Sequence, residues 1–310
     1  MNPDLNKALQ GVSGILVTPY DANDGVEPGK LQPIVDRAID AGVHVLVVNG
    51  NTGEYYSLTP LEAETMAAAA ARLVAKRVPL LGGVGRSVRE AAGLAAVYRD
   101  LGLDGVLVHQ PPDPFASPRG VTEYVRAVSE AAEGMPLILY LRNDGIGLDA
   151  ILGLCDLPGV VAVKWACPTP TRLAEAIRRR PDIIWICGLA EIWASPFAAV
   201  GATGFTSGLM NVWPERSVDI QRALRAADFA AARQLIDEIV AFEDIRAEEL
   251  NGTNVTVVKA ALEMVGLGCG PTRPPSSWPL TERQQERLKG LLSQWSIVGG
   301  SASSNVSAAI

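Results

Sequence analysis

The sequence has few of the side chains that metal centres and disulfide scaffolds require. Its 310 residues include only two histidines, His44 and His109, so a zinc site with three histidine ligands is excluded and a metal-dependent aldolase is not expected. The chain has four cysteines without a CxxC pair: Cys155, Cys167, Cys187 and Cys269. We therefore expect reduced, buried thiols, as is typical of a cytoplasmic protein.

Positive charge is also scarce. The 27 lysines and arginines are outnumbered by 34 aspartates and glutamates, which gives a net charge of −7. Nucleic-acid phosphates and anionic membrane surfaces repel an acidic molecule, so we expect neither as a partner. The amino-terminal segment lacks a basic cluster followed by an apolar core, so we predict no secretory signal and a cytoplasmic location.

One long segment, residues 192–214, lacks charge altogether and is long enough to span a bilayer. Five residues that interrupt regular helices occur within it: Pro196, Gly201, Gly204, Gly208 and Asn211. We therefore predict a short helix, a strand and a loop here rather than a membrane span.

What the chain does contain is enough apolar material for one large α/β barrel or two smaller domains, with 48% hydrophobic and 20% charged residues. Short apolar runs recur, each followed by a helix-like segment: 14–18, 44–49, 79–83, 105–109, 136–140, 160–164, 182–187 and 203–206. Continuous apolar runs are typical of strands covered on both faces, and their alternation with helices indicates parallel pairing. Eight such units predict an α/β fold of the (β/α)8 TIM barrel type, with a doubly wound open sheet as the alternative.

The segments between these runs carry helix signals. Thr59 and Glu62 form a capping box around Pro60, and Ser87 and Glu90 form a second one. Glycines stand where three helices should end: Gly42, Gly102 and Gly134.

Helical patterns replace the strand-like runs after Asn211. We predict helices at 215–250, 254–264 and 281–292, with a proline-stiffened turn at 270–279. Residues 1–212 are accordingly assigned to the barrel and residues 213–295 to a C-terminal helical extension of the same domain. The tail, residues 296–310, is expected to fray.

The ends of the strands are where a barrel of this kind places its active site. Lys164 closes the sixth run, and because burial favours a neutral amine that can form an imine with a ketone, it is a candidate nucleophile. Tyr140 closes the fifth run; neighbouring strands lie about 4.8 Å apart, so its phenol can act as an acid–base partner on the same substrate. The alternatives are a rim lysine that reaches water and an amphipathic rim tyrosine.

A glycine-bracketed turn, residues 50–54 (GNTGE), follows the second run. The N–H groups of such a turn form a concave anion site, and the Thr52 hydroxyl adds a donor, so a substrate carboxylate fits there. An ordinary βα turn is the alternative, and Glu54 is equally suited to bonding the turn as a structural carboxylate. Residues 82–87 lack the spacing of a phosphate loop and are interpreted as a turn. His109 ends the fourth run and is interpreted as a rim histidine, with a substrate contact as the alternative.

Together, the turn at 50–54, Tyr140 and Lys164 resemble the motif of the dihydrodipicolinate synthase / N-acetylneuraminate lyase family of Schiff-base barrels. The resemblance runs from about residue 10 to residue 295 and includes three further segments: 18–19 (TP), 207–211 (SGLMN) and 273–275 (RPP). It implies that Lys164 forms an imine with pyruvate or another 2-oxo acid and that Tyr140 is the acid–base group. It further implies that a carboxylate binds the turn at Asn51, Thr52 and Gly53, that no metal or organic cofactor is needed, and that the enzyme is a homotetramer.

Three positions depart from the members of that family that condense pyruvate with aspartate semialdehyde. Asn51 stands where those synthases have a threonine, Pro112 where they have a second tyrosine, and Gly145 where they have an arginine. The segment 140–144 (YLRND) is closer to the YNRxN of 5-dehydro-4-deoxyglucarate dehydratases, although Leu141 replaces the asparagine. The resemblance therefore favours a dehydratase, with or without decarboxylation, of a 2-oxo-3-deoxy sugar acid such as 5-dehydro-4-deoxyglucarate.

Several alternatives stay open at this point. Arg142 is a candidate for gripping a distal carboxylate and Ser207 for bonding a substrate hydroxyl, and either could instead only shape the rim. The activity could also be that of a pyruvate-dependent aldolase or a condensing synthase. A flavin or phosphosugar barrel would require a phosphate site, for which residues 203–208 are the candidate. A barrel that binds a 2-oxo acid without turnover is the non-catalytic alternative.

Overall fold

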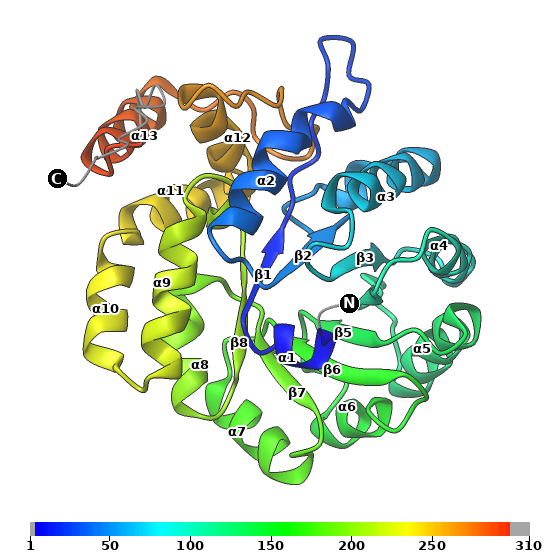
Figure 1. The fold of residues 1–310 in the computed structure, drawn as a ribbon. Helices are drawn as coiled ribbons and strands as arrows, with labels where there is room; N and C mark the ends of the chain where they lie inside the picture. Colours follow the sequence, from blue (N-terminus) through cyan, green and yellow to red (C-terminus); the bar gives the residue numbers. More distant parts are fainter. Residues whose placement is uncertain (1–3, 298–310) are drawn as a thin grey trace, which may run out of the picture.

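The computed structural model describes residues 4–297, and its centre is a closed barrel of eight parallel strands (Figure 1). The strands are β1 (Val12–Ile15), β2 (Val45–Val48), β3 (Leu80–Val84), β4 (Gly105–His109), β5 (Leu137–Leu141), β6 (Val160–Trp165), β7 (Ile184–Cys187) and β8 (Gly204–Ser207). Each strand pairs with the next in parallel, and β8 pairs with β1. The predicted TIM barrel is therefore confirmed, and the open sheet is excluded because the ring closes.

An outer ring of helices covers the barrel (Figure 1). It consists of α2 (Gln32–Asp40), α3 (Pro60–Val74), α4 (Val88–Asp100), α5 (Pro118–Ala132), α6 (Leu148–Leu154), α7 (Pro170–Arg179), α8 (Ala194–Ala199) and α9 (Pro214–Arg225). Four short 3-10 turns lie between elements: η1 (Pro28–Leu31), η2 (Tyr55–Ser57), η3 (Glu191–Trp193) and η4 (Leu209–Asn211). Both predicted capping boxes are present at α3 and α4. Gly42, Gly102 and Gly134 have the positive φ angles that helix ends need, which confirms their predicted role.

The carboxyl-terminal third contains more and shorter helices than expected. The single helix predicted at 215–250 is wrong, because the structure has three helices there: α9, α10 (Phe229–Asp237) and α11 (Val240–Asn251). Ala227 takes a positive φ of 55° after α9, and the Asp228 side chain then caps α10. The other two predictions hold, as α12 (Asn254–Met264) and α13 (Glu282–Gln294).

The helix α9 packs against α2, β1 and β8. It therefore lies in the outer ring, although it falls within residues 213–295, the range expected for the extension. The predicted turn at 270–279 joins α12 to α13. Most of the tail for which fraying was predicted, residues 298–310, lies outside the described residues.

Two apolar layers hold the barrel together. The inner layer fills the barrel and includes Leu9, Leu107 and Ile138, together with Tyr140 at its upper edge. The outer layer packs the other face of each strand against the helices. The short helix α1 (Leu5–Ala8) packs against the inner layer at the amino ends of the strands. The four cysteines are free and buried, as expected. The continuous apolar runs are thus explained, since each strand buries both faces.

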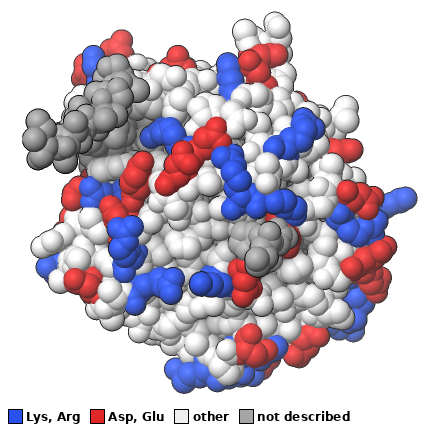
Figure 2. Space-filling view, in the orientation of Figure 1, with Lys and Arg blue, Asp and Glu red and all other residues white. Residues whose placement is uncertain are grey.

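The uncharged segment at 192–214 forms a short helix, a strand and a short 3-10 turn, as predicted. Among the described residues, no helix has the length and apolar character that a membrane crossing would require. Figure 2 shows lysines and arginines intermixed with aspartates and glutamates over the face that it draws.

Candidate active site

A cavity of about 660 Å³ opens at the carboxyl ends of the strands. Strand ends and the turn after β2 supply one part of its lining, and α11 with the start of α12 supplies the other. Six polar residues of the lining can take part in binding or catalysis: Asn51, Thr52, Tyr140, Arg142, Lys164 and Arg246. The carboxyl end of the strands is where barrels of this type place their catalytic groups.

Lys164 sits near the end of β6 with its side chain turned into the barrel, and it is only 4% exposed. No ion pair with Lys164 is found among residues 4–297. Burial is the main cause that lowers the pKa of its ammonium to about 7, and the positive charge of Arg142 adds to this effect. A large fraction of Lys164 is therefore a neutral, nucleophilic amine at neutral pH.

Tyr140 lies directly beside Lys164, because the two residues are register partners on β5 and β6. The Lys164 Nζ atom is 3.9 Å from the centre of the Tyr140 ring. Burial raises the pKa of the phenol to about 12, so Tyr140 carries its proton at neutral pH. The predicted proximity of amine and phenol is confirmed.

Asn51 contributes a contact that the sequence does not reveal. Its Nδ2 donates a hydrogen bond of 2.8 Å to the Tyr140 hydroxyl oxygen. Because the phenol oxygen accepts this bond, its own proton is left to point at a group in the cavity. Asn51 thus orients the phenol as a donor.

Buried contacts of Gly53 and Glu54 hold the turn after β2 in place. Gly53 is buried, and a Cβ there would lie 2.9 Å from the Leu16 carbonyl oxygen, so only glycine fits. Glu54 accepts a hydrogen bond from the Arg273 backbone N–H and forms a 2.6 Å ion pair with Lys259 on α12. The structural interpretation of Glu54 is therefore correct, and Asn51 and Thr52 are the residues of the turn that face the cavity.

The pair of Glu54 and Lys259 is almost fully buried, so it predicts a large effect on stability. Lys259→Met is expected to lower the free energy of unfolding by about 3–5 kcal/mol, because the Glu54 carboxylate stays buried without its cation. The double variant Glu54→Gln/Lys259→Met removes both charges and is expected to lose less. Urea denaturation of the two variants measures the difference, and equal losses would contradict the claim that the unpaired Glu54 charge causes the loss.

The interpretation of His109 as a rim residue is wrong, because the side chain is buried against the Tyr140 ring and does not line the cavity. It is 1% exposed, its ring stacks on Tyr55 at 5.0 Å, and it meets the Tyr140 ring edge-on at 5.2 Å. Burial is the main cause that lowers its pKa to about 3, so the imidazole is neutral. His109 therefore supports Tyr140 by packing.

The other two predicted site residues, Arg142 and Ser207, lie in different surroundings, one exposed and one buried. Arg142 is exposed at the rim and lines both the main cavity and a neighbouring hollow beside residues 110–118. Ser207 is fully buried and is not among the residues that line the cavity; its hydroxyl contacts the hydroxyl of Ser217 and accepts from the Met210 N–H. The neighbouring Thr206 lines the cavity instead. Successive residues of a strand face opposite sides, so only one of Thr206 and Ser207 can face the cavity.

The sequence patterns do not predict a cluster of charged residues at the cavity wall. Arg246 and Glu243 on α11 are both buried and form a 2.6 Å ion pair. Nearby, burial and the Glu243 charge raise the pKa of the fully buried Glu191 to about 7, and its Oε1 accepts a bond from Ser217. No sequence signal marks this cluster, because it depends on how α11 packs over the barrel mouth.

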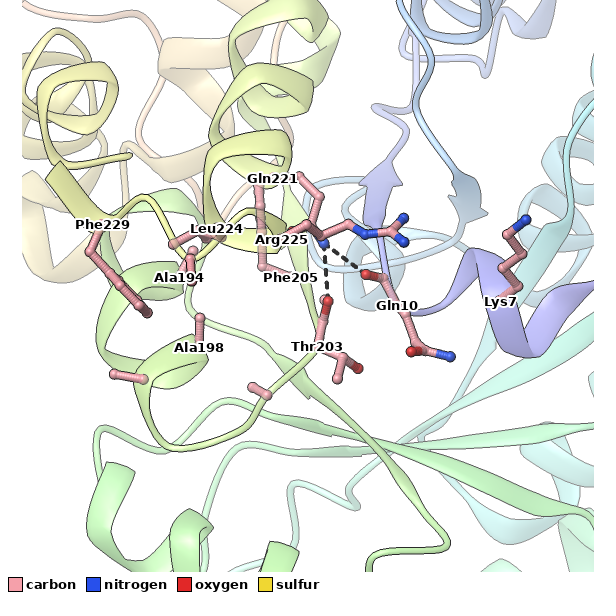
Figure 3. Close-up of a pocket in the computed structure, with 14 residues that line it drawn as sticks. Lys7, Gln10, Ala194, Ala198, Thr203, Phe205, Gln221, Leu224, Arg225 and Phe229 are labelled. Carbon is pink, nitrogen blue, oxygen red and sulfur yellow. Dashed lines mark hydrogen bonds between the residues drawn. The ribbon is translucent and has the colours of Figure 1, made fainter. Parts of the chain in front are cut away.

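A second cavity, of about 570 Å³, lies at the opposite, amino-terminal end of the strands (Figure 3). The side chain of Gln221 bridges the carbonyl oxygens of Gln10 and Thr203 there, with bonds of 2.7 and 3.0 Å. Its described lining includes no carboxylate, imidazole or thiol. We therefore interpret this cavity as part of the packing between α1, α8 and α9, and the catalytic site as the one around Lys164.

Comparisons with known proteins agree with this geometry. The family model of the dihydrodipicolinate synthetase family matches residues 8–295. A probable 5-dehydro-4-deoxyglucarate dehydratase of Saccharopolyspora erythraea is 32% identical over 240 residues, which cover 76% of this chain and 77% of that protein. A 4-hydroxy-tetrahydrodipicolinate synthase of Methanoculleus marisnigri is 29% identical over 292 residues, covering 92% of this chain and 98% of that one.

The fold is shared with solved members of the family. The crystal structure of dihydrodipicolinate synthase from Bacillus clausii superimposes with a TM-score of 0.90 at 35% identity, covering 94% of this chain and 100% of that one. The corresponding synthase from Oceanobacillus iheyensis gives the same TM-score and identity, over 94% of this chain and 98% of that one. The chain therefore belongs to the dihydrodipicolinate synthetase family and is a lyase of the imine-forming class.

Proposed function

We propose that this enzyme dehydrates a 2-oxo-3-deoxy sugar acid, such as 5-dehydro-4-deoxyglucarate, through an imine on Lys164. The observation that carries the proposal is the buried amine, which forms no ion pair among residues 4–297, beside a protonated phenol in one cavity. An amine of this kind attacks a ketone, and a phenol can exchange protons with the atoms that react. The turn at Asn51 and Thr52 supplies neutral donors for the substrate carboxylate.

The reaction balances with these groups alone. The Lys164 amine attacks the ketone carbon C2, and the ketone oxygen leaves as water, with Tyr140 as its proton donor. The protonated imine withdraws electrons, so C3 loses a proton to the Tyr140 phenolate left by the first step, and an enamine forms. The enamine then expels the hydroxyl on C4, which takes up the proton that Tyr140 now carries and leaves as a second water. Hydrolysis of the remaining protonated imine consumes one water, returns the free amine and gives the released proton back to Tyr140.

The departure at Asn51 supports dehydration over condensation. An amide that donates to Tyr140 does not pass protons onward as a hydroxyl does, so the phenol exchanges its proton directly with the substrate. Arg142 at the rim is suited to the second carboxylate of 5-dehydro-4-deoxyglucarate. The relative named as a probable dehydratase of that compound points the same way.

Turnover assays separate the candidate reactions. The purified enzyme is incubated with 5-dehydro-4-deoxyglucarate, and in parallel with pyruvate plus aspartate semialdehyde, and products are followed by mass spectrometry. We expect loss of water from the sugar acid, with carbon dioxide release showing whether decarboxylation follows. Pyruvate as a product would instead identify an aldolase, consumption of the semialdehyde a condensing synthase, and binding without consumption a non-catalytic barrel.

The pKa of Lys164 predicts how imine formation depends on pH. Only the neutral amine reacts, so trapping of pyruvate with cyanoborohydride should rise about tenfold per pH unit below the pKa and level off above about pH 8. Tyr140 and Cys187, whose pKa values are raised to about 12, do not titrate in this range. Glu191 does, so Glu191→Gln is the control that should keep the inflection near pH 7. An inflection near pH 10 would contradict the proposed state of Lys164.

We further propose a cytoplasmic homotetramer. The buried free cysteines suit a reducing compartment, and the family resemblance supports the tetramer. Light scattering of the purified protein at several concentrations tests the assembly, and a monomer at all of them would contradict it.

A further inference from the structure

We infer that Arg246 provides the positive charge that binds the substrate carboxylate at the turn of Asn51 and Thr52. This inference rests on the proposed function, since it assigns a role within the same site. The turn offers only neutral donors, and a carboxylate that leaves water for a buried cavity needs a compensating charge. Lys164 does not supply one while its amine is neutral.

The position of Arg246 fits this role. It is only 4% exposed and lines the cavity from α11. A Cβ placed on Gly208 would lie 2.7 Å from the Arg246 Nη2 atom and 3.2 Å from the Thr52 Oγ1 atom. The guanidinium and the threonine hydroxyl thus meet over the same glycine, and the missing side chain at Gly208 leaves room for both.

The hydrogen bonds of the guanidinium leave donors for a ligand. Nε donates to the Asn254 carbonyl oxygen, Nη1 to Glu243 Oε1, and Nη2 to Asn254 Oδ1. Among residues 4–297, one N–H on Nη1 and one on Nη2 have no further partner. A guanidinium that is held rigidly and keeps two free donors is suited to a carboxylate.

Arg142 is less suited to this task. It is exposed at the rim and faces both the main cavity and the hollow beside it. The two arginines therefore divide the substrate between them, with Arg246 at the carboxylate next to the ketone and Arg142 at the far end. A dicarboxylate is the substrate class that uses both.

Selective trapping tests the inference. Pyruvate and its neutral methyl ester carry the same ketone, so the ratio of the concentrations that give half-maximal borohydride trapping measures recognition of the carboxylate alone. We expect the wild type to prefer pyruvate, and Arg246→Gln to reduce that preference about 10- to 100-fold, as is typical for a hydrogen bond to a charged group. Arg246→Lys should restore part of the preference. Arg216→Gln, at an arginine paired with Glu238 outside the cavity, should leave it unchanged.

The possible outcomes distinguish a failure of the role of Arg246 from a failure of the proposed function. An unchanged ratio in folded Arg246→Gln overturns the inference, as does a loss of binding limited to the six-carbon substrate, which would place Arg246 at the far end. Since Arg246→Gln leaves Glu243 unpaired, the double variant Glu243→Gln/Arg246→Gln provides the same readout without a buried lone charge. A wild type that pyruvate does not label contradicts the proposed function itself, whereas labelling without a change in ratio contradicts only the role of Arg246.

Discussion

Lys164→Ala should lose turnover by a factor on the order of 10⁴ or more, because the covalent route through the imine disappears with the amine. Folding should be kept, since Lys164 forms no ion pair among residues 4–297 that the substitution would leave half-broken. Steady-state assays with the substrate that the wild type consumes, together with circular dichroism, measure both effects.

Lys289→Ala is the matched control for this prediction. Lys289 lies exposed on α13, away from the cavity, and its loss should leave the rate unchanged. If Lys164→Ala kept substantial activity, another group would have to form the covalent bond or the reaction would not use one.

The second large effect is expected at Tyr140. Tyr140→Phe should lower kcat by about 10²- to 10⁴-fold, because the ring still packs against His109 but no longer carries a proton to the leaving oxygen. KM should change little, since the phenol acts on the reacting atoms. Rapid-quench measurements should show slow imine formation and slow release of product.

Asn51→Ala tests how much of the Tyr140 contribution depends on the orientation of its hydroxyl. This variant keeps the hydroxyl and removes only the donor that holds it at 2.8 Å, so the expected loss is about tenfold. Equal turnover rates for the wild type and Tyr140→Phe would contradict an acid–base role of Tyr140. If Asn51→Ala lost as much turnover as Tyr140→Phe, the loss would be assigned to the orientation of the phenol alone.

The sequence predicted the parts of this site that depend on one strand and its neighbour. Lys164 and Tyr140 end consecutive apolar runs, and consecutive parallel strands are neighbours, so their contact follows from topology. The side on which a residue points needs the register as well. The sequence alone therefore predicts Ser207 as a site residue, whereas the alternation along β8 turns Thr206 into the cavity.

The parts that escaped prediction join residues far apart in the chain. Lys259 reaches Glu54 from α12, and Arg246 reaches the neighbourhood of Thr52 from α11. No local pattern reports such contacts, because they depend on how the extension packs over the barrel. The break between α9 and α10 did carry a signal, the capping aspartate Asp228, but it lacks the glycine or proline that usually marks one.

The central claim is that one particular lysine is neutral and reactive at the barrel mouth. The chain has six lysines, and borohydride reduction in the presence of pyruvate followed by peptide mapping reports which of them forms the imine. We expect a single label on the peptide that contains Lys164, and no label in Lys164→Ala. A label on any other lysine, or none at all, would contradict it.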